Sequence, residues 1–226
     1  MIHRRVFLTA LLMSPSAFAQ PAPLFDSLTQ ADASRGVKAA LALAAQNATT
    51  RLGERNGFFG APRVRIPLPR LLASAQQNLR PMGLSAPLDD LQESLNHAAE
   101  STMPQAGRLF ADAVRTITLS DAIAIVRGGD DGATRYLRGR TETRLTSLLR
   151  PPMTSALTQS GAFTLLRQAS QRFHLGSAAA DLRGQVIDFA TAKALDGAFL
   201  YIAEEERAIR RDPVRRTSDI LRRVFG

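Results

Sequence analysis

"DLRGQVIDFATAKALDGAFLYIAEEERAI", residues 181–209, is the longest uninterrupted helical pattern in the chain. Its large apolar residues return to one face every three or four positions, which predicts an amphipathic helix of about seven turns. The residues of this apolar face are Leu182, Val186, Phe189, Leu195, Phe199, Ile202 and Ile209. A helix of this kind is stable only when other elements cover its apolar face.

The same period recurs in other parts of the chain, so the partners of this helix are predicted to be helices too. Residues 32–52, 88–99 and, more loosely, 109–117 carry it. The apolar positions are Ala33, Val37, Ala40, Leu41, Ala44, Ala48 and Leu52, then Leu88, Leu91, Leu95 and Ala99, then Leu109, Val114 and Ile117. The predicted fold is all-α, a compact multi-helix bundle with little or no β-sheet.

Short polar motifs mark where these helices begin and where the chain turns. Thr118 with Asp121, like Thr29 with Asp32, has the spacing of a capping box, and Asp212-Pro213 predicts one further helix start. The segments "RPPM" (150–153) and "HLGSAAADLRG" (174–184) are predicted joints between helices.

One segment, "NGFFGAPRVRIPLP" (56–69), does not have the helical period. Pro67 and Pro69 lack the amides that a central strand needs, so we expect an extended, proline-rich strap across the helices. Arg63 and Arg65 alternate with the apolar residues and are candidates for anion binding, as are Arg215 and Arg216. The alternative is that these arginines pair with helix carboxylates.

The stretch "RGGDDGATRY" (127–136) resembles a site but has the features of a corner between helices. It lacks the lysine of a phosphate-binding loop and the alternating acidic ligands of a calcium loop. Gly128 or Gly129 can end one helix, and we expect Asp130 to cap the next while Asp131 lies near its dipole.

Two acidic clusters could carry chemistry. Glu93, His97 and Glu100 share a helix face, the arrangement that di-iron bundle proteins use, but a solvated ion-pair face is the favoured interpretation, and no metal or other cofactor is predicted. The second cluster is "EEER" (204–207), which ion pairs along a helix explain. The enzyme alternative is a hydrolase that uses Asp130, Asp131 or the Glu204 cluster beside Tyr136 or Tyr201.

The first residues predict export from the cytoplasm. A basic start, an apolar run and "AFA" (17–19) form a signal peptide over residues 1–19, and "RRVFL" (4–8) also fits the twin-arginine type. Residues 20–27 are then a loose leader and 28–226 a single helical domain in the periplasm. The chain has no cysteine, which excludes disulfides and thiolate chemistry, and no later run is long enough to span a membrane.

The formal net charge is +9, and almost all of the basic residues are arginine. Arginine suits anionic groups of the cell envelope, although a GC-rich genome would give the same bias. There is no Trp, Tyr is scarce and the basic residues are interspersed with acids, so nucleic acid is not a predicted partner.

Several motifs together resemble the bacterial domain of unknown function 4197 family. They are "GFFGAPRVRIPLP", "NHAAESTMPQAGRLFADAVRTITLSDA", "GGDDGATRYL", "KALDGAFLYIAEEERAIRRDP" and "RRTSDILRRVFG", in this order from about residue 28 to residue 226. The resemblance implies an exported, largely helical protein of Gram-negative bacteria. It implies no activity and no catalytic residues.

The function expected from the sequence is a non-enzymatic periplasmic module that binds an envelope component or a partner protein. The candidate binding residues are Arg63, Arg65, Asp130, Asp131, Tyr136, Glu204, Glu205 and Arg216. Besides the hydrolase, the alternative is peripheral membrane binding through a final helix over residues 213–225.

Overall fold

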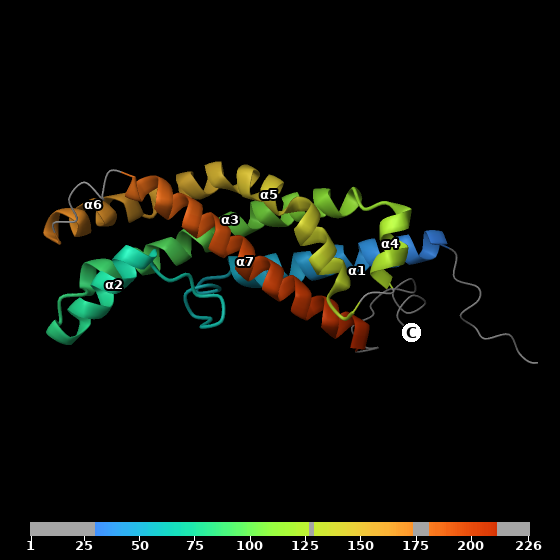
Figure 1. Ribbon diagram of the computed structural model, residues 1–226, viewed down its shortest axis with the longest axis horizontal. Coiled ribbons are helices and arrows are strands. Elements are labelled where there is room, and N and C mark those ends of the chain that lie inside the picture. Colours follow the sequence, from blue (N-terminus) through green and yellow to red (C-terminus); the bar gives the residue numbers. More distant parts are fainter. Residues whose placement is uncertain (1–29, 127–128, 174–180, 212–226) are drawn as a thin grey trace, which may run out of the picture.

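The computed structural model describes residues 30–126, 129–173 and 181–211. Within these residues there are helices and no strand, which confirms the predicted all-α bundle. Four long helices form a ring, and each packs against two others: α1 (Gln30–Gly53), α3 (Ala86–Arg115), α5 (Gly132–Gln159) and α7 (Leu182–Arg211). Neighbours in this ring run in opposite directions, as the colours of Figure 1 show.

Shorter helices close the two ends of this bundle, which is longer than it is wide (Figure 1). At one end lie α2 (Arg70–Leu79), the 3₁₀ turn η2 (Arg80–Met82) and α6 (Ala162–Arg172). At the other end α4 (Leu119–Val126) packs on α1 and α5. None of the described helices has the length and apolar character needed to cross a bilayer.

The core lies along the axis of the ring, where the apolar faces predicted from the sequence meet. Phe110 of α3 and Phe199 of α7 are both buried, and their rings meet edge to face with centroids 5.2 Å apart. Aromatic pairs prefer this geometry because the positive edge of one ring faces the negative face of the other.

Two glycines allow close approach at helix crossings. A Cβ atom on Gly107 of α3 would lie 2.8 Å from Oγ1 of Thr49 on α1. A Cβ atom on Gly197 of α7 would lie 2.8 Å from the ring of Phe58, which is fully buried. Real Cβ contacts are longer than this, so both positions need a residue without a side chain.

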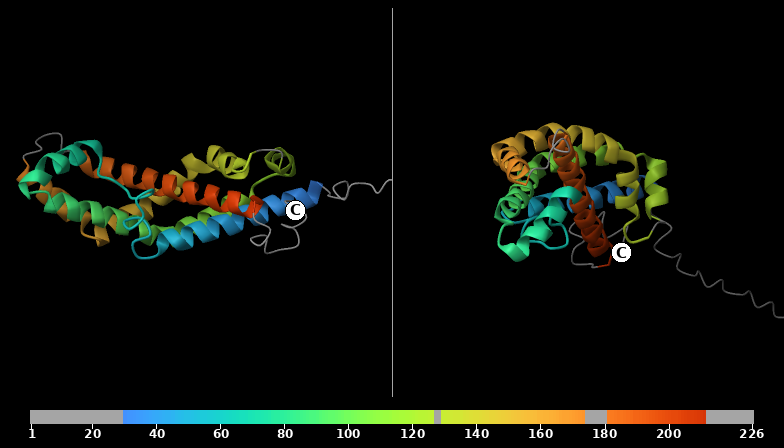
Figure 2. Two further views of the ribbon diagram at one scale, coloured as in Figure 1. Left: turned by 90° about the horizontal axis from the view of Figure 1, so that it is seen from below. Right: turned by 60° about the vertical axis from the view of Figure 1, so that its left-hand side comes forward.

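The connection between α1 and α2, residues 54–69, lies against α3 and α7 (Figure 2). Asn96 of α3 is buried and bonds both backbone groups of Ile66: its Oδ1 accepts from the amide at 2.8 Å, and its Nδ2 donates to the carbonyl at 2.9 Å. Glu100, also on α3, accepts hydrogen bonds from three backbone amides, those of Asn56, Phe58 and Phe59. Side chains of α3 thus supply the hydrogen-bond partners that the backbone groups of this segment would otherwise find in a neighbouring strand.

The predicted joint at residues 150–153 is wrong, because α5 continues through Pro151 and Pro152. Each proline removes the amide that would bond a carbonyl one turn earlier, which normally ends a helix. Here Leu149, Met153 and Leu157 are all buried on the same side of α5. Their packing holds the helix together across the two prolines. The other predicted joint lies mostly in residues 174–180, which are outside the described part of the chain.

The start of α5 also differs from its prediction. Asp131, not Asp130, is the N-cap residue, and its side chain makes no capping hydrogen bond. Instead Glu206 of α7, which is 1% exposed, accepts hydrogen bonds from the amides of Ala133 at 3.0 Å and Thr134 at 2.8 Å. The predicted capping box at α4 is confirmed, since the amide of Thr118 donates to Asp121 and the amide of Asp121 donates to Oγ1 of Thr118.

Candidate functional site

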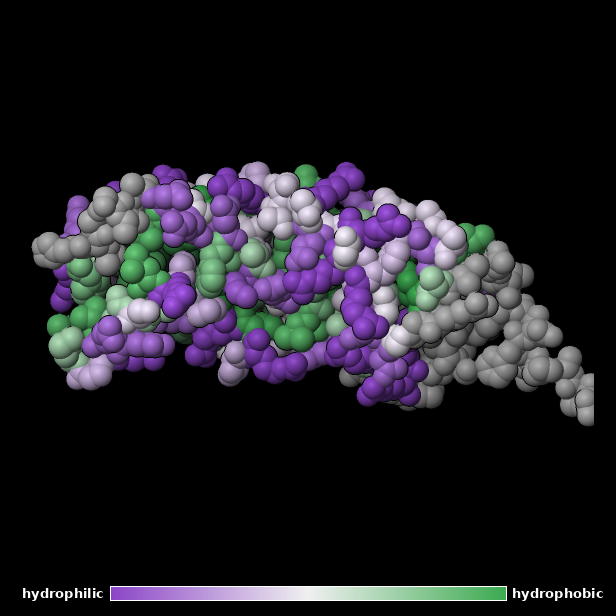
Figure 3. Space-filling model, viewed as in Figure 1, coloured by the Kyte–Doolittle hydropathy of each residue, from purple (hydrophilic) through white to green (hydrophobic). Residues whose placement is uncertain are grey.

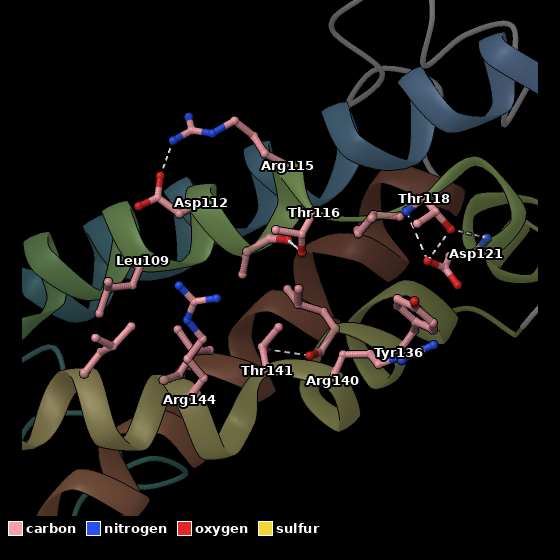
Figure 4. Close-up of a pocket in the computed structure, with 15 residues that line it drawn as sticks. Leu109, Asp112, Arg115, Thr116, Thr118, Asp121, Tyr136, Arg140, Thr141 and Arg144 are labelled. Carbon is pink, nitrogen blue, oxygen red and sulfur yellow. Dashed lines mark hydrogen bonds and ion pairs between the residues drawn. The ribbon is translucent and has the colours of Figure 1, made fainter.

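A groove with a volume of about 740 Å³ lies between the C-terminal part of α3, the start of α4 and the first half of α5 (Figure 4). Its lining combines leucines, arginines and a few hydroxyl groups. The lining residues are Leu109, Asp112, Ala113, Arg115, Thr116, Ile117, Thr118, Asp121, Tyr136, Leu137, Arg140, Thr141, Arg144, Leu145 and Leu148.

The apolar wall of the groove follows from helical spacing on its two sides. Leu137 and Leu145 lie eight residues apart on α5, with Thr141 between them, so the three share one face. Leu109 of α3 lines the opposite side. Leu137 and Leu145 are buried, whereas Leu148 at the same face is 42% exposed. The wall therefore extends from the core out to the solvent.

Two arginines of α5 stand beside this wall. Arg140 and Arg144 are four residues apart, and both are exposed. Figure 4 shows the guanidinium of Arg144 in the space between α3 and α5. Among the described residues, no carboxylate forms an ion pair with Arg144. The guanidinium of Arg140 lies 5.5 Å from the ring centre of Tyr136.

The other charges of the groove are held by neighbours in the protein. Arg115 forms an ion pair with Asp112 on the same helix, on the side of α3 away from α5 (Figure 4). Hydrogen bonds from Thr118, then from Tyr136, lower the pKa of Asp121 to about 2. Burial, followed by the hydrogen bond to Asp121, raises the pKa of Tyr136.

These shifts decide what the groove can do chemically. A carboxylate whose pKa is about 2 is a weak base at neutral pH, and a tyrosine with a raised pKa stays protonated there. General acid–base catalysis needs groups whose pKa values lie near the working pH, and these two groups move away from it. The arrangement is suited to binding, with cations and an apolar surface side by side.

A second, mostly apolar groove of about 560 Å³ lies between α1 and α3, where Thr49 meets Gly107. Its lining includes Ala42, Gly53 and Ala111, and Arg108 is the basic residue that borders it. It results from the close crossing of the two helices.

The structure places the arginines of the 54–69 segment against the protein itself. Arg63 forms an ion pair with Glu204 of α7. Arg65 donates to the carbonyl of Phe59 at 2.5 Å, and its guanidinium lies 5.0 Å from the ring centre of that residue. Arg63 thus has the helix carboxylate that the alternative interpretation named, whereas Arg65 contacts a residue of its own segment and no helix carboxylate in the described part of the chain. Arg215 and Arg216 lie outside the described residues.

The predicted acidic residues pair with other side chains of the protein, and none of them lines either groove. Asp130 pairs with Arg211, and Asp131 with Arg207 and Arg135. Glu205 accepts a hydrogen bond from Asn47 of α1. Of the predicted site residues that the structure describes, Tyr136 alone lines the groove between α3 and α5. The carboxylates considered for a hydrolase therefore do not converge on Tyr136.

The cluster of Glu93, His97 and Glu100 has a structural role. The ring of His97 bonds Glu100 through Nδ1 at 2.8 Å and Glu93 through Nε2 at 3.2 Å. Glu100 is buried and already holds the backbone amides of the 54–69 segment. Among the described residues, no group of three or more His, Asp or Glu side chains is arranged to hold a metal ion.

The sequence analysis missed Arg140 and Arg144, although a signal for them exists. In "RYLRGRTETRLTSLL" (135–149), positions 137, 141 and 145 share the face of the helix that lines the groove, with the two leucines buried and Thr141 half-buried. Arg140 lies one residue before 141, and Arg144 lies one residue before 145. This places them at the edge of the buried face rather than opposite to it. Recognising the groove also required knowing that the end of α3 faces this stretch.

With the geometry in place, comparison with known proteins gives one finding. The family model described as "Protein of unknown function (DUF4197)" matches residues 27–226, which confirms the resemblance found in the sequence. No curated protein and no solved structure matches the chain.

Proposed function

Because the chain belongs to the DUF4197 family, whose description states no function, we propose one from the groove itself. The protein is an exported, non-enzymatic binding module that takes up an amphiphilic small molecule of the cell envelope between α3 and α5. The observation that carries this proposal is a groove of about 740 Å³ in which a leucine wall continues to the surface beside arginines. Ligand sites are usually concave, mostly apolar and marked by a few polar groups.

The size and lining of the groove suit a single apolar chain. Leu109, Leu145 and Leu148 offer a surface along which such a chain loses contact with water, and this transfer is favourable for every methylene buried. The exposed Leu148 marks the side from which a chain enters.

A matched pair of substitutions tests the proposal. Thr141 lines the groove, whereas Thr143 is exposed on the same helix and does not. Thr141→Trp should fill the groove and Thr143→Trp should leave it open. Native mass spectrometry of the protein mixed with dodecyl phosphate or dodecyl maltoside should show at least one of the two bound to wild type and to Thr143→Trp, and neither bound to Thr141→Trp. Failure of both amphiphiles to bind the wild type contradicts the proposal.

Export into the periplasm is part of this proposal and is supported by the sequence of residues 1–19. Cell fractionation should recover the protein from the periplasm, with an N-terminus at Gln20. Replacing Arg4 and Arg5 by lysine should block export if the twin-arginine route is used and should leave it unchanged on the general route.

A second candidate is contact with a lipid surface at the α2–η2 end. Leu71, Met82 and Leu84 are 44%, 61% and 42% exposed there, and Figure 3 shows hydrophobic residues gathered at this end of the molecule. Backbone groups of the turn are bonded internally, since the amides of Gly83 and Leu84 donate to carbonyls of residues 80 and 79. Liposome flotation should be reduced by Met82→Asp and unaffected by Leu119→Asp at the opposite end.

The hydrolase alternative has less support. Asp130, Asp131 and Glu204 all form ion pairs with arginines, and none of them lines either of the two grooves. Membrane binding through residues 213–225 concerns a segment outside the described residues.

A further inference from the structure

We propose that the groove selects amphiphiles with an anionic headgroup, and that Arg144 is the residue that binds this headgroup. The inference rests on the proposed function and names the class of ligand for the same site. The shared chemistry is a phosphate or carboxylate at the end of one apolar chain.

The first step of the argument is the position of Arg144. Its guanidinium lies between α3 and α5 (Figure 4), next in sequence to Leu145, which is part of the apolar wall. Among the described residues it has no carboxylate partner. A guanidinium presents a planar set of donors that matches the oxygens of a phosphate or carboxylate, and such charge-assisted hydrogen bonds are stronger than neutral ones.

The second step is the state of the other charges that line the groove. Asp112 is paired with Arg115, and Asp121 accepts hydrogen bonds from Thr118. Neither carboxylate therefore needs a ligand cation, and three arginines against two aspartates leave the lining with a positive excess. An anionic ligand is attracted by this excess, and a cationic one is repelled.

The third step is that, of the three arginines that line the groove, Arg115 and Arg140 lie against other lining residues, so Arg144 is the one placed to bind a headgroup. Arg140 is four residues before Arg144, so the two side chains emerge from the same face of α5. The guanidinium of Arg140 lies 5.5 Å from the ring centre of Tyr136, and its charge helps to lower the pKa of Asp121. Arg140 therefore adds to the positive field of the groove, and Arg144 contacts the headgroup.

Because of the apolar wall, the groove should bind an amphiphilic anion more tightly than an inorganic anion. Inorganic phosphate could contact Arg144, but it would leave Leu109, Leu145 and Leu148 in water. An alkyl phosphate contacts both parts of the lining, so the tail and the headgroup should each contribute to its affinity.

The experiment is isothermal titration calorimetry with three probes: dodecyl phosphate, dodecyl maltoside and inorganic phosphate. The two dodecyl compounds are kept below their critical micelle concentrations. The proteins are wild type, Arg144→Gln, Arg144→Lys and the control Arg167→Gln. Arg167 is an exposed arginine of α6 that does not line the groove. Circular dichroism melting curves show that each variant is folded.

Wild type should bind dodecyl phosphate at least about ten-fold more tightly than either other probe, because only this probe uses both the leucine wall and Arg144. Arg144→Gln should weaken dodecyl phosphate about five- to ten-fold and dodecyl maltoside less than about two-fold. Arg144→Lys should lose less than Arg144→Gln, since it keeps the charge but not the planar fork. Arg167→Gln should bind like wild type.

Four outcomes would overturn the inference, and they differ in which part of the proposed function they leave standing. Equal binding of dodecyl maltoside and dodecyl phosphate removes the headgroup selectivity and leaves amphiphile uptake intact. Equal binding of inorganic phosphate and dodecyl phosphate makes the groove a plain anion site. An unchanged affinity of Arg144→Gln for dodecyl phosphate removes the role of Arg144. If neither dodecyl compound binds, the proposed function fails together with this inference.

Discussion

The carboxylate of Glu206 on α7 caps the first turn of α5 through Thr134, accepting hydrogen bonds from its amide at 2.8 Å and its hydroxyl at 2.6 Å. Helix N-termini carry unpaired amides and a partial positive charge, so a carboxylate there is doubly favourable. Residues 72 positions apart in sequence are joined in this way. The contact fastens the start of α5 at Thr134, two residues before Tyr136 of the groove, to the last turns of α7.

Removing this carboxylate should destabilise the protein strongly. Glu206→Ala leaves buried amides without an acceptor and removes the buried ion pair between Glu206 and Arg210, so we expect a loss of about 3–5 kcal/mol in the free energy of unfolding. Urea denaturation followed by circular dichroism measures this. Glu204→Ala on the same helix is the control, since it breaks only a partly exposed pair and should cost about 1 kcal/mol or less. Similar losses in the two variants would refute the capping role.

The contact between Gly197 and Phe58 predicts a coupled pair of substitutions. Gly197→Ala gains about 1 kcal/mol of helix propensity, but its Cβ would lie 2.8 Å from the Phe58 ring, and overpacking typically costs about 1–3 kcal/mol. We expect a net destabilisation.

The double variant Gly197→Ala with Phe58→Leu should be more stable than the sum of the two single changes predicts, because the smaller side chain leaves room for the new methyl group. A double-mutant cycle of unfolding free energies measures this coupling. Additive effects would show that the ring moves aside without cost.

Local patterns in the sequence were sufficient to predict the helices. The spacing of Leu182, Val186 and Ile209 gave α7, and the pairing of Thr118 with Asp121 gave the start of α4, because both depend on neighbours within a few turns. The errors occurred where distant residues decide the outcome. Pro151 and Pro152 remain inside α5 because buried side chains on both sides of them pack into the core.

The candidate site illustrates the same limit. Tyr136 was identified from its own motif, but the groove exists because the end of α3 lies opposite α5. Asp130 and Asp131 resembled site residues because acidic pairs beside glycines are common in ligand loops, and in the structure they pair with Arg211 and Arg207. Nothing within the motif could have shown which arginines those would be.

The lowered pKa of Asp121 predicts a change in stability at low pH. Its folded pKa is about 2, below the ordinary value of 3.8, because of hydrogen bonds from Thr118 and then Tyr136. The unfolded chain therefore binds the proton first as the pH falls. The stabilisation from Asp121 is complete above the ordinary value and is lost as the pH falls towards about 2. Asp121→Asn should flatten this part of the curve of unfolding free energy against pH, and Asp112→Asn should change it less. Parallel curves for wild type and Asp121→Asn would contradict the assignment.

His97 should produce the opposite dependence at higher pH. Its hydrogen bond to Glu100, opposed by burial and assisted by Glu93, raises the pKa of His97 above 6.5. The folded protein therefore keeps the proton to a higher pH than the unfolded chain. The stabilisation from His97 is complete below 6.5 and is lost as the pH rises through the folded pKa. Measured from pH 5 to 9, the unfolding free energy of wild type should fall relative to that of His97→Gln.

The same Glu100 holds the 54–69 segment by accepting hydrogen bonds from the amides of Phe58 and Phe59. Hydrogen exchange at these two amides, corrected for the intrinsic exchange rate at each pH, should therefore speed up from pH 5 to 9 more in wild type than in His97→Gln. If exchange at these amides has the same pH dependence in both proteins, His97 does not support the segment through Glu100.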